Sequence, residues 1–254
     1  MKRYERNRIY LSSNDQTQIK KVRVLLAGAG IGSNIAETLL RLGFEKLTIV
    51  DGDVVEESNL NRQNYLLEDV GRPKVEALRE RLIAINPLAD IRILHTFIDH
   101  NNVNEIIEGH DIAINALDFT SDIPLVFDQL CAERGMYVLH PYNIGFASML
   151  IVLAPQGVGL DSLLAEGEDV IGFEKRVVQH VTDYFNYWVR PKVWIEEVVQ
   201  IYERENGKLP PPQLSIASSF LGGMCAAILL RIVRGEFVKV FPKFYYYSDC
   251  DDLN

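Results

Sequence analysis

Short runs of apolar, often β-branched residues alternate with segments of helical period up to residue 153. The runs have the length of strands and lie at residues 22–27, 46–50, 91–97, 111–116, 136–140 and 148–153. The helical segments lie at residues 31–42, 74–85, 103–108 and 123–134, and a glycine or proline follows each. Strands that alternate with helices predict an α/β fold, with a doubly wound and mainly parallel sheet covered by helices on both faces.

The alternation stops after Pro155. Residues 156–212 are irregular, then helical and aromatic, and end in three consecutive prolines. We expect them to form a helical insertion, or crossover segment, within a single domain that covers residues 1–254. Residues 214–233 predict a long return helix, and residues 236–247 predict one or two final strands, so that the later strands are antiparallel.

The return helix is the most membrane-like part of the chain, since it is about 20 residues long, which is close to spanning length. Serines and the pair Gly222-Gly223 dilute its apolar character. A buried helix is therefore the favoured interpretation, and we expect no membrane association.

Composition and charge indicate which ligands and which compartment are expected. The chain of 254 residues has 48% hydrophobic residues and a formal net charge of -9, which argues against a broad basic surface for nucleic acid. Its three cysteines form no CxxC pair, which predicts a reducing compartment, the cytoplasm, and no zinc site. The charged N-terminus lacks the apolar core of a signal peptide.

A glycine turn follows the first predicted strand. Gly28, Gly30 and Gly32 lie between that strand and a helix, where glycines let backbone amides approach phosphates at a helix N-terminus. The next strand ends at Asp51 and Asp53, about 20 residues later, where a carboxylate often binds ribose hydroxyls. This pattern predicts a Rossmann-like nucleotide site. The alternative is that the glycines only pack a tight turn and the aspartates only cap it.

Polar and cationic residues follow the strand that carries Asp51. Asn59, Arg62, Gln63 and Lys74 come soon after it, in the crevice where an open parallel sheet binds its ligand. A dinucleotide such as NAD needs few cations there, whereas a triphosphate needs several. The segment therefore favours ATP.

The same segment resembles the ThiF, MoeB and HesA superfamily of adenylating proteins, which are similar to ubiquitin-activating enzymes. The resemblance rests on Asp-x-Asp, Ser-Asn-Leu-x-Arg-Gln and Pro-Lys-Val sequences after a glycine-rich turn, all of which occur between Asp51 and Val75. It extends to Arg3-Tyr4-x-Arg6 and to Asp118 after a predicted strand, and so covers most of residues 3–153.

The resemblance implies a role for each matching residue. The ribose would be held by Asp51 and Asp53. The phosphates would lie beside Gly28, Gly30 and Gly32 and would be surrounded by Asn59, Arg62, Gln63 and Lys74. Asp118 would bind Mg²⁺, and Arg6 would reach the ATP site of a second subunit. The protein would then be a homodimer, with Arg6, Arg62, Lys74 and Asp118 as its catalytic residues.

The implied reaction is the ATP-dependent adenylation of a C-terminal carboxylate, on a small ubiquitin-like or sulfur-carrier protein or on a peptide, with release of pyrophosphate. A carboxylate is ionised at neutral pH and attacks the α-phosphorus without a general base. Arginine, lysine and Mg²⁺ stabilise the charge on the phosphates. Two alternatives stay open: an NAD(P)-dependent oxidoreductase, and a non-catalytic nucleotide-binding module that recruits a partner.

The sequence departs from the family pattern at four places. The turn is one glycine short, and residues 115–119 keep Asp118 but lose the family's neighbouring polar residues. The zinc-binding CxxC pairs are missing, and so is a cysteine for a thioester. Cys225 is expected in the core, and Cys250 lies in an acidic tail that disfavours a thiolate.

Two further features are weaker candidates. His140 is predicted at a strand end near the presumed substrate channel, although a structural role is favoured. The aromatic residues between positions 184 and 194 could form a binding surface, but amphipathic core packing is the stronger expectation.

Overall fold

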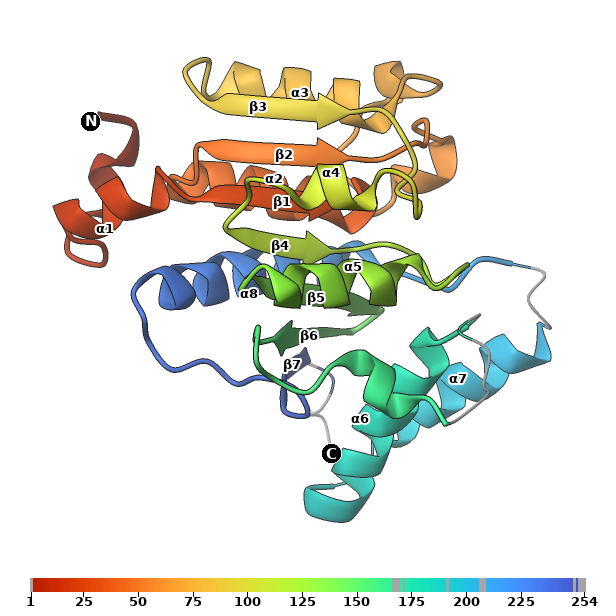
Figure 1. Ribbon diagram of the computed structural model, residues 1–254. Helices are drawn as coiled ribbons and strands as arrows, with labels where there is room; N and C mark the ends of the chain where they lie inside the picture. The colour runs from red at the N-terminus through yellow and green to blue at the C-terminus, as the bar shows by residue number, and fades with distance from the viewer. Residues whose placement is uncertain are drawn as a thin grey trace.

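The computed structural model describes residues 2–165, 170, 172–190, 192–205, 209–248 and 250. Its strands form one sheet in the order β3-β2-β1-β4-β5-β6-β7 (Figure 1). They are β1 (Arg23–Ala27), β2 (Lys46–Val50), β3 (Asp90–Leu94), β4 (Ile112–Asn115), β5 (Tyr137–Ile144), β6 (Ala147–Leu153) and β7 (Phe244–Ser248). Strands β1 to β5 are parallel, and β6 and β7 are antiparallel to their neighbours. The predicted mainly parallel sheet with antiparallel later strands is confirmed.

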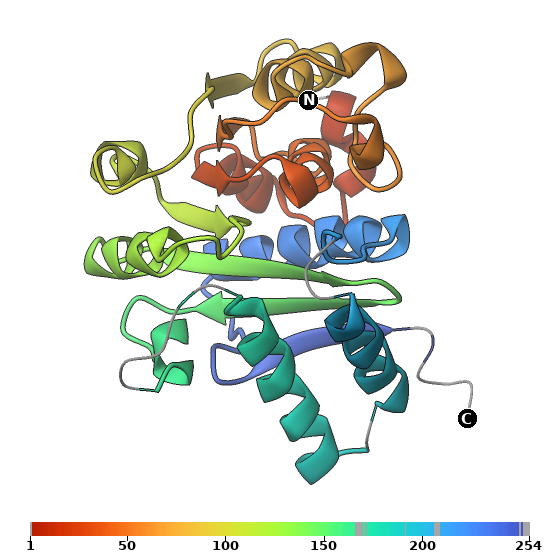
Figure 2. The same ribbon diagram turned by 90° about the vertical axis from the view of Figure 1, so that its right-hand side faces the viewer.

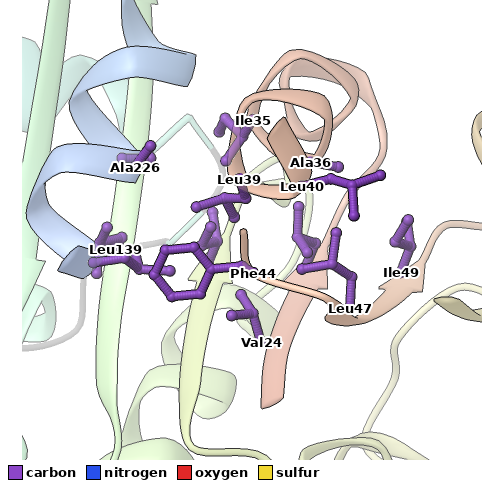
Figure 3. Packing of buried hydrophobic residues seen from close by; sticks show 14 of the residues in the cluster. Val24, Ile35, Ala36, Leu39, Leu40, Phe44, Leu47, Ile49, Leu139 and Ala226 are labelled. Carbon is purple, nitrogen blue, oxygen red and sulfur yellow. The ribbon is translucent and has the colours of Figure 1, made fainter. Parts of the chain in front are cut away.

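Helices cover both faces of this sheet. The helices α2 (Gly30–Leu42), α3 (Lys74–Ile85) and α8 (Ser215–Val233) lie on one face, and α4 (Val103–Ile107) and α5 (Ile123–Glu133) lie on the other (Figure 1). In β1, Val24 and Leu26 point into the first core, whereas Leu25 and Ala27 point into the second. Figure 3 shows the first core, where Phe44 packs among side chains of α2, β1 and β2. A strand buried on both faces has no polar side, which is why these strands are continuous apolar runs.

The long apolar helix α8 packs on the sheet and on α2. By length and composition it is the one helix among the described residues that could cross a membrane. Its residues Leu221, Cys225 and Leu229 are fully buried. At Gly222 a Cβ atom would lie 2.7 Å from Thr38 Oγ1, so the glycine permits the close approach of the two helices. The predicted return helix is confirmed, and one of its faces is buried.

The segment between β6 and α8 contains η4 (Leu160–Leu163), α6 (Glu174–Trp188) and α7 (Val193–Arg204). Its helices α6 and α7 lie beyond β6 and β7, at the edge of the sheet that β7 forms, as both ribbon views show (Figures 1 and 2). Phe185 packs its ring 4.8 Å from that of Tyr246 on β7, whereas Tyr187 and Trp188 are 80% and 71% exposed. The expected core packing of the aromatic stretch holds for Phe185 but is wrong for these two neighbours.

Several element boundaries differ from the predictions. β3 ends at Leu94 instead of residue 97, because the chain turns there and His95 Nε2 lies 3.1 Å from the carbonyl oxygen of Gly52. β5 continues to Ile144, so His140 lies within a strand and not at its end. Only one of the two possible final strands is present between residues 236 and 248.

Short elements complete the description. At the N-terminus, η1 (Lys2–Asn7) and α1 (Ser13–Ile19) were not predicted. Two further single turns, η2 (Glu57–Asn59) and η3 (Leu67–Asp69), lie in the loop between β2 and α3.

Candidate active site

The glycine turn connects β1 to α2 at the carboxyl end of the sheet. Gly28 has a φ of +98°, and a Cβ atom there would lie 2.5 Å from the carbonyl oxygen of Ala116. Both facts require glycine, because a side chain would be strained and would collide with the backbone after β4. Gly30 begins α2, and Gly32 lies inside its first turn. Backbone amides at a helix N-terminus favour the binding of anions.

Asp51 ties this turn to the end of β2. Its Oδ2 accepts a hydrogen bond of 2.6 Å from the Ala29 amide, and its Oδ1 accepts one of 2.8 Å from the Asp53 amide. Each oxygen has a further lone pair for a ribose hydroxyl. Tyr65, which the sequence reasoning missed, donates a hydrogen bond of 2.8 Å to the Ala29 carbonyl. Burial, followed by the charge of Asp51, raises the pKa of the Tyr65 hydroxyl, so it stays a donor that fixes the turn.

The loop between β2 and α3 returns the chain to the end of β2, so that Lys74 lies beside Asp53. Val54 and Pro73 pair in an antiparallel bridge, so Lys74, the first residue of α3, begins beside the end of β2. Its Nζ lies 2.9 Å from Asp53 Oδ2, and the lysine is only 7% exposed. A phosphate that reaches Lys74 would compete with Asp53 for the ammonium group.

Arg62 carries a charge with neutral partners. Its Nε donates a hydrogen bond of 2.5 Å to Gln213 Oε1, and its Nη1 donates to the Ser58 carbonyl at 3.0 Å and to Asn61 Oδ1 at 2.8 Å. Burial lowers the pKa of the guanidinium, and the negative charge of Asp118 opposes this shift. Arg62 remains ionised because the ordinary pKa of arginine is above about 12. A half-buried cation whose hydrogen-bond acceptors among the described residues are neutral is suited to attract an anion.

The side chain of Gln63 points at the glycine turn. A Cβ atom on Gly30 would lie 3.3 Å from Gln63 Nε2, so the amide is directly above the start of α2. Gln63 is 8% exposed, and its Oε1 has no hydrogen-bond partner among the described residues. Buried polar atoms are rarely left without partners, so this group fits a nucleotide that would complete its bonds.

Asp118 follows β4 at the rim of the site. The residue is exposed, yet nearby protein raises the pKa of its carboxyl group by partial desolvation and, next, through the charge of Glu174. The charges of Lys74, Asp53 and Asp51 also act on it. The structure therefore gathers the charged candidates of β2, α3 and β4 around one position. Glu174 belongs to the crossover segment and was not predicted.

These residues fit a magnesium ion only together with a nucleotide. No three His, Cys, Asp or Glu side chains form a metal-binding group in the described part of the chain. Mg²⁺ keeps several waters and is bound by about one or two carboxylates plus phosphate oxygens. Asp118, an accessible carboxylate whose neighbours include other carboxylates, satisfies that requirement.

Asn59 and His140 have structural partners. Asn59 is buried in η2, and its Oδ1 accepts a hydrogen bond of 3.0 Å from the Glu56 amide, which shapes the loop that leads to Arg62. His140 is 2% exposed, with Nε2 2.8 Å from Asp128 Oδ1. Asn115 donates to the same oxygen at 2.9 Å. The structural interpretation of His140 is therefore confirmed.

Arg6 lies near the opposite end of the strands from the glycine turn (Figure 1). Tyr4 and Asn7 bind the carbonyls of Leu40 and Leu42 at 3.3 and 2.9 Å, so η1 sits on the C-terminal end of α2 (Figure 1). The 13 residues of α2, at about 1.5 Å each, separate η1 from the glycine turn by the length of the helix. Arg6 is exposed, and it is not part of the site in its own chain.

The sequence matches one protein family and several named proteins. A model of the ThiF family matches residues 4–251. SAMP-activating enzyme E1 of Haloferax volcanii is 31% identical over 159 residues, which are 61% of this chain and 58% of that protein. Sulfur carrier protein ThiS adenylyltransferase of Bacillus subtilis is 30% identical over 159 residues, 60% of this chain and 47% of that protein. The chain spans about half the length of the curated relatives it matches.

Solved structures show the same fold. The crystal structure of E. coli MccB with ATP has a TM-score of 0.70 at 16% sequence identity, and the match covers 97% of this chain and 71% of that one. The crystal structure of PaaA has a TM-score of 0.69 at 20% identity, and the match covers 94% of this chain and 73% of that one. At these identities the likeness concerns the fold alone. Since the family model matches nearly the whole chain, this protein belongs to the ThiF family.

Proposed function

We propose that this protein uses ATP to adenylate the C-terminal carboxylate of an acceptor and releases pyrophosphate. The acceptor would be a small ubiquitin-like or sulfur-carrier protein, or a peptide. The observation that carries the proposal is Arg62, a half-buried guanidinium with neutral partners, which is close enough to Asp118 to be affected by its charge and precedes Gln63 at the glycine turn. A guanidinium whose described hydrogen-bond acceptors are all neutral is well suited to bind an anionic ligand.

Different residues bind different parts of the nucleotide. Asp51, next to the amides of the glycine turn, faces the ribose, while Arg62 and Lys74 face the phosphates. Asp118 would hold Mg²⁺, which supplies positive charge against the phosphate oxygens. Lys74 reaches the phosphates when its ion pair with Asp53 opens.

The chemistry needs positioning and charge rather than a base. A carboxylate oxygen of the acceptor attacks the α-phosphorus, a new P–O bond forms, and the bond to the bridging oxygen of the β-phosphate breaks. The electron pair leaves with pyrophosphate, so stabilisation of that leaving group is the main task of the protein. Arg62 and Lys74 are the described cations placed for it.

A homodimer would complete the charge around the phosphates. Arg6 lies about 20 Å from the glycine turn of its own chain, as the length of α2 indicates, but it is exposed and free to enter the site of a second copy. The test is to mix two inactive variants, Arg6→Ala and Asp118→Ala. Partial recovery of activity in the mixture supports sharing of sites, and no recovery contradicts it.

The names of similar proteins support this function over the alternatives. Relatives are named as adenylyltransferases or as an activating enzyme, and structures of E. coli MccB are described with ATP and with AMPCPP and MccA. A nicotinamide site would leave Arg62 and Lys74 without a role. Reaction in the cytoplasm remains part of the proposal.

The experiment is ATP–pyrophosphate exchange with purified protein. Candidate carrier proteins and peptides are each compared with a C-terminally amidated form, which cannot be adenylated. Exchange that requires both Mg²⁺ and a free C-terminus supports the proposal. Tighter binding of NAD than of ATP contradicts it, and ATP binding without exchange across the acceptor panel favours the non-catalytic module.

A further inference from the structure

The segment between β6 and α8, which comprises the crossover segment and Gln213, contacts two of the candidate site residues or their loops. The segment lies beyond β6 and β7 for most of its length (Figure 2). The start of α6 contacts the loop that carries Asp118, and Gln213, just before α8, contacts Arg62. The same segment therefore contacts both the loop that carries Asp118 and the proposed phosphate-binding cation, Arg62.

The first contact is a clamp on Phe119, the residue after Asp118. Glu174 Oε1 accepts a hydrogen bond of 2.9 Å from the Phe119 amide, and the Gly172 amide donates one of 3.3 Å to the Phe119 carbonyl. The rings of Phe119 and Phe173 lie 4.8 Å apart and are 3% and 1% exposed. Both backbone groups and the side chain of Phe119 are thus engaged, which fixes the position of Asp118.

The second contact fixes Arg62 without cancelling its charge. Gln213 Oε1 accepts from Arg62 Nε at 2.5 Å, and the Gln213 carbonyl accepts from Asn61 Nδ2 at 3.2 Å. The next residue is anchored as well, because the Asn143 side-chain amide donates to the Leu214 carbonyl at 2.8 Å. A neutral amide orients the guanidinium, whereas a carboxylate in its place would compete with a phosphate.

We propose that Glu174 and Gln213 are positioning residues through which the crossover segment sets the geometry of the nucleotide site. Glu174 holds the Asp118 loop, and Gln213 holds Arg62. This inference rests on the proposed function for its nucleotide, but the two contacts are measurable without it.

The first test measures the clamp directly, by hydrogen exchange of the Phe119 amide in the nucleotide-free protein. Glu174→Ala removes the acceptor and should speed exchange at Phe119 by about tenfold or more, since hydrogen bonds to charged groups are worth about 1.5–3 kcal/mol. Glu174→Gln keeps an acceptor oxygen and should restore most of the protection. Glu197→Gln, an exposed change on α7, is the matched control. Unchanged protection in Glu174→Ala overturns the clamp.

The second test measures binding of the ATP analogue AMPCPP by calorimetry, with and without Mg²⁺. Glu174→Ala should weaken only the part of AMPCPP binding that depends on Mg²⁺. Gln213→Ala should weaken binding in both conditions, and Gln213→Glu should weaken it further by pairing with Arg62. Gln200→Ala on α7 is the control. Wild-type affinity in Gln213→Glu, or an unchanged magnesium dependence in Glu174→Ala, overturns the proposal.

The two tests separate this inference from the proposed function. If the wild-type protein binds AMPCPP poorly, the proposed function fails, while the hydrogen exchange of Phe119 still decides whether the clamp exists. If AMPCPP binds but the variants behave like the controls, the positioning roles fail and the proposed function stands.

Discussion

Gly28 and Gly32, two glycines of the turn, should respond differently to alanine. At Gly28 the φ of +98° is a strained conformation for any other residue, at a cost of about 1–3 kcal/mol. The Cβ would also lie 2.5 Å from the Ala116 carbonyl oxygen, and Ala116 is held by a hydrogen bond of 2.8 Å from its amide to Ala27. Relief of such a clash costs about 1–3 kcal/mol more. Gly28→Ala should therefore lower the free energy of unfolding by about 2–6 kcal/mol.

The matched control is Gly32→Ala. A Cβ there meets its nearest atom, Leu26 Cδ2, at 3.9 Å, which is ordinary contact, and alanine is better than glycine inside a helix by up to about 1 kcal/mol. Thermal unfolding should thus show a Tm lower by at least about 4 °C for Gly28→Ala and an equal or higher Tm for Gly32→Ala. A Gly28→Ala protein as stable as the wild type, or less affected than Gly32→Ala, would refute this reasoning about the turn.

Two further predictions concern titration and reactivity. Burial raises the pKa of the Glu37 carboxyl, but hydrogen bonds from Arg81 and Arg41 outweigh it and leave the pKa below its usual value. The stability this carboxylate adds is present above about pH 4.3 and is lost as the pH falls through the lower folded pKa. The free energy of unfolding, measured in urea from pH 7 to pH 3, should therefore fall less steeply for Glu37→Gln than for the wild type. Parallel curves for the two proteins would contradict this prediction. Burial raises the pKa of the Cys225 thiol. Iodoacetamide should therefore label half-exposed Cys250 in the native protein and Cys225 only after unfolding, which mass spectrometry can check. Equal labelling of the two cysteines in the native protein would contradict this prediction.

Strand and helix order could be predicted because burial on both sides makes parallel strands continuously apolar. Boundaries depend on neighbours that the local sequence does not show. β4 pairs with β5 only as far as Leu139, so Pro141 faces only β6 and its missing amide leaves no bond to β4 unmade. The strand therefore continues beyond His140. By contrast, α1, which was not predicted, has a local signal in the sequence, the capping box between Ser12 and Asp15.

The site was predictable where residues follow a strand end in the same part of the chain. Asp51 and Lys74 belong to one motif and are joined through Asp53 in the structure. Glu174 and Gln213 were missed because their partners lie 55 and 151 positions away, and nothing in an irregular segment shows where it returns. Only the fold brings these residues to the nucleotide site.

The most direct test of the account is ATP–pyrophosphate exchange by Arg62→Ala. If the half-buried guanidinium stabilises phosphate charge, its loss should lower the exchange rate by about 10²–10³-fold, the cost of removing one group that stabilises the transition state. Arg92→Ala, which removes an arginine whose side chain is 74% exposed on β3, should exchange at the wild-type rate. Exchange by a folded Arg62→Ala protein at the wild-type rate would contradict adenylation at this site.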